Sequence, residues 1–382
     1  MRTPSLLLLI SWLLAACAGA PTVAPAADHL FADRLFGAPR ERVTTEDVFT
    51  ATDAMRRFLA VDIADQLRTE GLQKGLFEAL YRKAQLKLDY DAASTKTAAQ
   101  AFESRSGNCL ALVIMTASLA KELKLNVSYQ SAYLEETWAR DGDLILASGH
   151  VNIVVGRRVA DAMTRSELSP LTIDFLPPGE IRRLRTRDIS EATVVAMFAN
   201  NRAAEALTKG MLDEAYAWSR EAVRNDPLFL AAYNTLGVIY LRHGAAERAA
   251  RAFEHILGTE PHHTRALSNL AVSYDRLGRT AEAGRVRTTL ASLEPHPPFH
   301  HFNLGMAAMR VGDYRAARDH FAREVERAEY YHEFQYWLAV AQQHLGEAAE
   351  AKKHLRLAME RSLARDQHDR YAAKLERLRA RQ

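Results

Sequence analysis

The feature that most constrains the fold is a spacing of 34 residues in the second half of the chain. Five glycines keep this spacing (244 − 210, for example), and an alanine follows each of them by five positions. The glycines are Gly210, Gly244, Gly278, Gly312 and Gly346, and the alanines are Ala215, Ala249, Ala283, Ala317 and Ala351. Repeats of this length build supersecondary units that stack on their neighbours, so the pattern predicts an elongated array rather than a single globule.

Within a unit, the residue types predict two antiparallel helices. A small residue seven positions before the glycine lets the two helices approach closely, as at Gly237 and Gly305. The glycine of the 34-residue spacing then makes the turn, where a left-handed backbone costs little. Proline ends the second helix of the first three units, at Pro227, Pro261 and Pro295, because it cannot continue a helix.

The most regular unit carries seven residues of a known pattern: Leu236, Gly237, Tyr240, Gly244, Ala249, Phe253 and Pro261. These residues resemble the tetratricopeptide repeat. The resemblance implies an all-α solenoid of five repeats over residues 198–365, closed by a charged cap helix over residues 366–382. Solenoids present a long groove that suits an extended peptide or a partner helix, so the expected partner is a protein or peptide. A rigid spacer without a ligand is the alternative.

The first residues have the layout of an export signal. Arg2 precedes the apolar run from Leu6 to Leu14, which is too short to span a bilayer comfortably. The run ends in Leu-Ala-Ala-Cys at Cys17, which resembles the bacterial lipoprotein box. The resemblance implies a signal peptide over residues 1–16, cleavage before Cys17, and a lipid on its sulfur that binds the membrane. A secretory signal cut near Ala16 or Ala20 is the alternative.

A lipidated chain of this kind faces the periplasm of the bacterial cell envelope, and residues 17–39 are its tether. Ala18 and Gly19 follow the cysteine and lack the aspartate associated with inner-membrane retention in some bacteria, so the outer membrane is preferred. The formal net charge of +3 is too balanced to favour nucleic acid as a partner. With Cys17 lipidated, Cys109 is the sole thiol of an exported protein, and is either buried and inert or chemically reactive.

Residues 40–190 predict a separate α+β domain, with helices first and strands afterwards. We expect a helix capped by Thr45-Glu46-Asp47, a second over 76–86, and a buried helix over 110–123 with Cys109 in its first turn. Short β-rich runs follow over 127–134, 144–147, 151–155 and 171–175. His150 opens one of these strands, and Asp174 lies on another.

Gly107-Asn108-Cys109 before a buried helix, with His150 and then Asp174 on later strands, resembles the transglutaminase-like superfamily of the papain-like fold. The resemblance implies a catalytic triad of Cys109, His150 and Asp174. A helix N-terminus favours a thiolate, an imidazole holds it as an ion pair, and a carboxylate orients the imidazole. Each residue also has a structural interpretation: a packed cysteine, an ordinary strand histidine, and a turn-capping aspartate.

The oxyanion of an acyl transfer needs hydrogen-bond donors beside the nucleophile. The backbone N–H of Cys109 is one candidate, and the side chains of Asn108, Gln100 and Tyr129 are others that the sequence does not rank. The predicted function is therefore an envelope-anchored cysteine acyl-hydrolase, either a protease or a peptide amidase. A non-catalytic scaffold for protein–protein interaction is the alternative, and a cross-linking transglutaminase is a further one.

Two other patterns are interpreted as structural. The histidines of the repeats predict no metal site, because no cysteine or acidic cluster joins them. The Arg-rich segment 182–187 is interpreted as a solvated linker between the two domains, with contact to an anionic polymer or phospholipid as the alternative. No cofactor is expected, since the chain has no glycine-rich phosphate loop.

Overall fold

The structure is a computed structural model that describes residues 27–81, 86, 88–90, 94–141, 144–158, 170–173, 185–296, 299–329, 331–362 and 365–379. Cys17 and Asp174 therefore lie outside the described residues. In the described part of the chain, none of the helices combines the length and the apolar character that crossing a bilayer requires.

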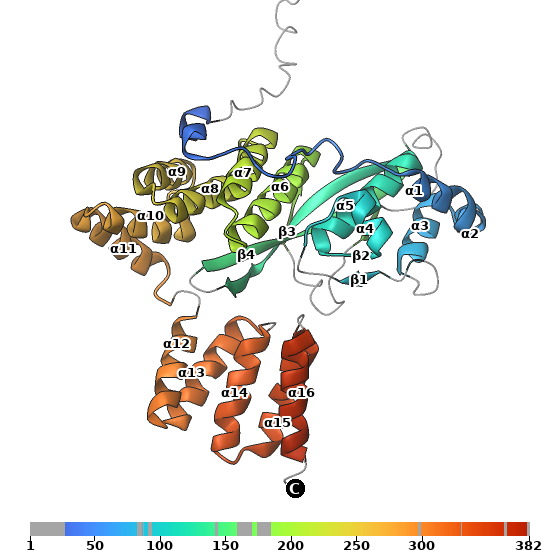
Figure 1. Ribbon diagram of the computed structural model, residues 1–382. Coiled ribbons are helices and arrows are strands. Elements are labelled where there is room, and N and C mark those ends of the chain that lie inside the picture. The colour runs from blue at the N-terminus through green and yellow to red at the C-terminus, as the bar shows by residue number, and fades with distance from the viewer. Residues whose placement is uncertain are drawn as a thin grey trace, which may run out of the picture.

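The N-terminal half begins with short helical turns and continues with helices and small strands (Figure 1). The turns are η1 (Asp28–Leu30) and η2 (Asp33–Leu35). The helices that follow are α1 (Asp53–Arg57), the π-helical turn η3 (Phe58–Asp62), α2 (Ala64–Glu70), α3 (Leu72–Tyr81), α4 (Ala98–Ser104) and α5 (Cys109–Glu122). Strands β1 (Asp89–Tyr90) and β2 (Ser106–Gly107) form a small parallel pair that leads into α5.

A four-stranded antiparallel sheet has the order β5-β4-β3-β6. Its strands are β3 (Leu125–Asp141), β4 (Leu144–Arg158), β5 (Leu171–Ile173) and β6 (Arg185–Ile189). The face that packs towards the core carries Tyr129 on β3 and Val151, Ile153 and Val155 on β4, all almost fully buried. Helix α5 packs against β3 and β4, so the half has the α+β character that the sequence predicts.

Two local predictions in this half are wrong. The first helix begins at Asp53, not after residues 45–47, because Thr52 accepts a hydrogen bond from the Met55 N–H and caps it there. The predicted strands over 144–147 and 151–155 form one continuous strand, β4, because both halves pair with β3 in a long hairpin. The predicted second helix over 76–86 corresponds to α3, which begins earlier, at Leu72, and residues 82–85 lie outside the described residues.

The Arg-rich segment is not a solvated linker throughout, contrary to the prediction. Residues 185–189 form β6, which pairs antiparallel with Tyr129–Tyr133 of β3. The segment joins the sheet because Ile189 lies beside the buried Tyr129 and packs against the core, while Arg187 and Asp188 stay exposed. Strand β6 lies at one end of the strand order, so it is an edge strand.

The C-terminal half consists of five antiparallel helix pairs and a last helix. The pairs are α6 (Glu191–Thr208) with α7 (Leu212–Asn225), α8 (Leu230–His243) with α9 (Ala246–Thr259), α10 (Thr264–Arg276) with α11 (Thr280–Leu293), α12 (His300–Val311) with α13 (Tyr314–Arg327), and α14 (His332–His344) with α15 (Ala348–Arg361). Helix α16 (Arg365–Arg379) follows. Each of the five spaced glycines has a positive φ, between 71° and 89°, which confirms that this glycine makes the turn of its pair.

The close approach within a pair is also confirmed. A Cβ added to Gly237 would lie 2.5 Å from the ring of Phe253, and one added to Gly305 would lie 2.6 Å from the ring of Phe321. Both phenylalanines are fully buried, so the second helix rests its ring directly on the backbone of the first. Gly107, by contrast, has no positive φ, and its missing side chain leaves room for Ala111, since a Cβ there would lie 2.8 Å from the Ala111 Cβ.

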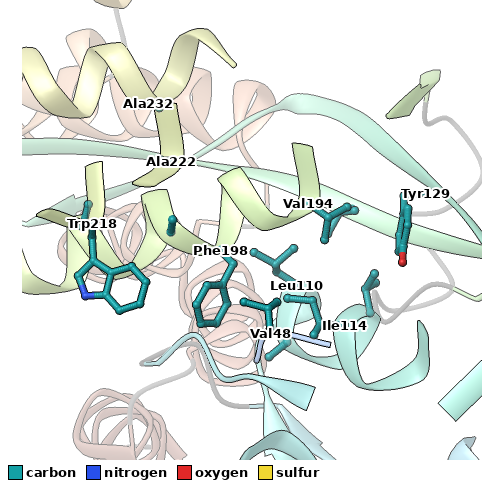
Figure 2. Packing of buried hydrophobic residues seen from close by; sticks show 14 of the residues in the cluster. Val48, Leu110, Ile114, Tyr129, Val194, Phe198, Trp218, Ala222 and Ala232 are labelled. Atoms are coloured by element: carbon teal, nitrogen blue, oxygen red, sulfur yellow. The ribbon is translucent and has the colours of Figure 1, made fainter. Parts of the chain in front are cut away.

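The N-terminal half and the first helix pairs share their buried residues. One cluster of buried residues runs from Ala27 to Ala283, and in it α5 packs directly against α6: Leu110 and Ile114 face Val194 and Phe198 (Figure 2). The sheet domain and the first helix pairs therefore fold around one shared core.

The array is divided after α11. Ala283 is the only buried residue of α11, all of whose residues are described, and a new cluster starts at Phe299. Figure 1 shows α12 to α16 as a separate group of helices. Arg327 links the two groups, with hydrogen bonds to the Glu294 carboxylate at 3.0 Å and the His296 carbonyl at 2.5 Å. A further small cluster joins α14, α15 and α16 through Ala339, Ala351, Leu355 and Leu375. The helix pairs before and after the division thus do not share a core, and we call the two groups packing units.

Candidate functional sites around Cys109 and on the repeats

Cys109 is the first residue of α5, as the sequence predicts. Asn108 is the N-cap: its Oδ1 accepts the Ala111 N–H at 2.9 Å, and this bond fixes the start of the helix at Cys109. In the stretch just before this helix, Arg105 has a left-handed backbone, with φ of 51°, whereas Gly107 does not have a positive φ. The Cys109 thiol is free and buried, with 8% of the residue exposed.

The lengths of α5 and β3 predict that the backbone of His150 lies near the level of the start of α5. Helix α5 has 14 residues, which span about 21 Å, and β3 returns antiparallel to it after the turn at residues 123–124. A strand covers that rise in about six residues, which leads to Ser131 and Ala132. Ala132 is the register partner of His150 on β4. The side chain of His150 and the whole of Asp174 lie outside the described residues, although β5, which Asp174 follows, pairs with β4.

The three side chains considered as oxyanion donors all take part in structural hydrogen bonds. Asn108 caps α5, and its Nδ2 donates to the Thr95 hydroxyl at 2.9 Å. Gln100 forms a capping box with Thr97 at the start of α4. Tyr129 donates to the Glu191 carboxylate at 2.7 Å, and burial together with this bond raises the pKa of its hydroxyl.

Hydrogen bonds near Cys109 connect the sheet domain to α6 of the first helix pair. The Thr95 N–H donates to the Glu205 carboxylate of α6 at 2.6 Å, and Glu205 also pairs with Arg202 at 3.0 Å. A cavity of about 380 Å³ lies beside Thr95, between α4 and Arg202. A larger one of about 580 Å³ lies between α1 and α4, against Phe58 and Phe102. Cys109 lines neither cavity.

The repeats offer a second candidate site on the first helices of two neighbouring pairs. Asn269 of α10 donates to the Asn234 Oδ1 of α8 at 3.0 Å, so the two amides lie side by side. Val238 and Val272 lie one turn further along the same helix faces, and Val272 is 40% exposed. We call Asn234, Val238, Asn269 and Val272 the asparagine surface. Its amide and apolar groups are the kinds that bind an extended backbone and its side chains.

No group of three or more histidine, cysteine or acidic side chains in the described residues has the arrangement of a metal site. The nearest feature is a gathering of histidines at the start of α12, where the Nδ1 atoms of His301 and His320 lie 3.3 Å apart. Burial and the neighbouring cations lower the pKa of His301, which favours its neutral form.

Comparison with known proteins identifies the repeats. A family model described as tetratricopeptide repeat matches residues 234–286 and 302–362. The C-terminal half therefore contains tetratricopeptide repeats, as the sequence pattern predicts. No curated protein matches the chain.

Solved structures of repeat proteins are similar to part of this chain. A thermophilic TPR protein of Thermus thermophilus is 18% identical, with 47% of this chain and 98% of that chain covered and a TM-score of 0.30. A tetratricopeptide repeat protein from Parabacteroides merdae is 20% identical, with 48% and 73% covered and a TM-score of 0.26. YrrB, described as a TPR protein with an unusual peptide-binding site, is 18% identical, with 47% and 92% covered and a TM-score of 0.26.

Proposed function

We propose that this protein is a non-catalytic scaffold whose tetratricopeptide repeats bind a protein or peptide partner. The observation that carries the proposal is the asparagine surface. It places two adjacent side-chain amides and an exposed valine on neighbouring first helices. Side-chain amides can pair with the N–H and C=O groups of an extended peptide, and the valine offers apolar area for one of its side chains.

A selection of random peptides displayed on phage, with the chain as bait, tests the binding function. We expect Val272→Asp to weaken the selected peptides about tenfold or more, because it removes apolar contact and introduces a charge at the surface. Val311→Asp is the matched control, because Val311 is 81% exposed and lies on α12, in the other packing unit. Selected peptides that bind both variants as tightly as the unaltered chain contradict the proposal.

The second candidate function is that of a cysteine acyl-hydrolase, and a cross-linking transglutaminase shares its chemistry. It is favoured by the position of Cys109 in the first turn of α5, where free N–H groups favour a thiolate. The low exposure of Cys109 favours the scaffold.

Alkylation of Cys109 by iodoacetamide at neutral pH separates the two functions. For the scaffold we expect slow alkylation of the folded chain, unchanged by His150→Ala, because an 8% exposed thiol offers little access to the reagent. Alkylation at least as fast as that of an exposed free thiol, and slowed by His150→Ala, establishes an activated nucleophile and overturns the non-catalytic proposal. A Cys109→Ser variant controls for modification elsewhere.

The proposal includes attachment to the bacterial cell envelope through a lipid on Cys17, facing the periplasm, with the outer membrane preferred. Its support is the sequence around Cys17, which resembles the lipoprotein box. The intact mass of the mature protein tests this part: a mass without the lipid, or one unchanged by Cys17→Ser apart from the substitution itself, contradicts it.

A further inference from the structure

The first described residues lie against the repeats, far from them in sequence. We call residues 27–40 the leading segment. It contains η1 and η2 and crosses the second helices α7 and α9 (Figure 1). Leu30 is 4% exposed and belongs to the shared core, whereas Leu35 is exposed. Side chains of α7 and α8 hydrogen-bond to the segment.

Side chains of the repeats bind the backbone of the leading segment. The Tyr216 hydroxyl accepts the Ala32 N–H at 2.8 Å, and the Tyr240 hydroxyl donates to the Leu30 carbonyl at 2.8 Å. Further along, the Asp213 carboxylate accepts the Gly37 N–H at 2.8 Å, and Glu214 accepts the Arg40 N–H at 3.1 Å. A protein surface binds a peptide in the same way, by forming hydrogen bonds to its backbone N–H and C=O groups.

The side chains of the segment are also bound individually. Asp33 accepts a hydrogen bond from the Tyr216 hydroxyl at 2.6 Å and pairs with Arg220 at 2.8 Å. The Phe36 ring stacks on the Tyr216 ring, with centroids 4.1 Å apart and planes 9° from parallel. The surface therefore favours a carboxylate, through the charge-assisted pair, and an aromatic ring beside it, through stacking. A groove with only apolar groups would not select these two side chains.

The bound stretch contains the same four-residue pattern twice: Asp28-His29-Leu30-Phe31 and Asp33-Arg34-Leu35-Phe36. Each copy forms a 3₁₀ turn closed by the phenylalanine N–H on the aspartate carbonyl, at 3.0 Å and 3.3 Å. The copies use different groups, because the first buries its leucine, whereas the second exposes Leu35 and contributes Asp33 and Phe36. The surface therefore binds Leu30 of the first copy, through its carbonyl, and Asp33 and Phe36 of the second.

We infer that the surface formed by Tyr216, Arg220 and Tyr240 is a peptide-binding site for a turn that carries an aspartate and, three residues later, a phenylalanine, and that the leading segment of this same chain occupies it as a detachable ligand. The site lies on α7 and α8 and is distinct from the asparagine surface on α8 and α10. A tethered ligand has an effective concentration in the millimolar range, so the site stays closed to weak ligands from solution until the segment is released.

A fluorescent peptide of residues 27–40, titrated into the full chain, tests the inference by anisotropy. We expect no binding at about 100 µM peptide to the unaltered chain, because the segment in place has the higher effective concentration. The chain with Asp33→Ala and Phe36→Ala is expected to bind the peptide. Adding Arg220→Ala to that chain should weaken binding about tenfold or more, because it removes the charged partner of Asp33.

A peptide carrying the same two alanines is the matched control and should not bind. A double variant that keeps its helical circular dichroism but binds neither peptide, or binds both equally, overturns the inference. Peptide binding by the unaltered chain that is as tight as binding by the double variant also overturns it, since the segment would then not occupy the site.

Amide hydrogen exchange on the unaltered chain tests the same point without a substitution. We expect the Ala32 and Gly37 amides to exchange together and faster than the amides of α7, which is the behaviour of a segment that detaches while the repeats stay folded. Exchange of these two amides only at the rate of α7 would make the segment an integral part of the fold and would contradict its role as a ligand.

Discussion

Replacing Phe321 with alanine is expected to unfold α12–α16 while α6–α11 stay folded. The Phe321 side chain is fully buried, packs against Phe302 and Trp337, and covers Gly305. Removing a buried phenylalanine side chain costs about 3–5 kcal/mol, which is a large part of the stability of a small packing unit. The cluster that contains Phe321 begins at Phe299 and is separate from the core that ends at Ala283. The loss of stability should therefore be confined to α12–α16.

Phe253→Ala is the matched control, because Phe253 has the equivalent place over Gly237 in the second pair and is also fully buried. Its removal should destabilise the shared core of α5–α11 and spare α12–α16. Thermal unfolding followed by circular dichroism, with hydrogen exchange by mass spectrometry on each half, measures both effects. If both variants lower one common transition by the same amount, the array unfolds as a single unit and the division has no energetic meaning.

Gly237→Ala is expected to destabilise the protein although alanine favours helices. The added Cβ would lie 2.5 Å from the Phe253 ring, which is fully buried, so the ring or the helix would have to shift. Overpacking of this kind costs about 1–3 kcal/mol. The contact lies inside the shared core, so the loss should be seen in the unfolding of both the sheet and the first helix pairs.

Gly284→Ala provides the comparison, because Gly284 lies inside α11 and a Cβ there would meet nothing within 4 Å. It should stabilise the chain by up to about 1 kcal/mol through helix propensity alone. Urea denaturation midpoints of the two variants measure the difference. Equal midpoint shifts in the same direction would show that propensity, and not the approach of the two helices, determines the residue at Gly237.

The sequence predicts the repeats well because their features are local. A glycine every 34 residues requires only that one backbone position in each unit adopt a positive φ, and the five glycines do so. The same holds for Cys109, whose place at the start of α5 follows from the cap at Asn108 and the apolar run behind it. Neither feature depends on how distant segments meet.

The candidate site is only partly predictable for the opposite reason. The place of His150 opposite Ala132 depends on the length and register of the β3–β4 hairpin, which the sequence divides into shorter strands. The hydrogen bond of Asn108 to Thr95, and that of Thr95 to Glu205 on α6, join residues whose types give no signal of their pairing. The sequence does not predict strand β6, because its arginines are also typical of a solvated linker.

The sequence by itself therefore determined the repeat unit, its turns and the helix that begins at Cys109. These follow from backbone dihedral preferences and from the period of apolar residues, which act over a few positions. Only the tertiary structure decided that the leading segment docks on α7–α9, that the sheet and the first pairs share one core, and that the array divides after α11. These three outcomes depend on which surfaces lie together, and the free energy of burying them is set by residues up to about two hundred positions apart, as Leu30 and Tyr240 are.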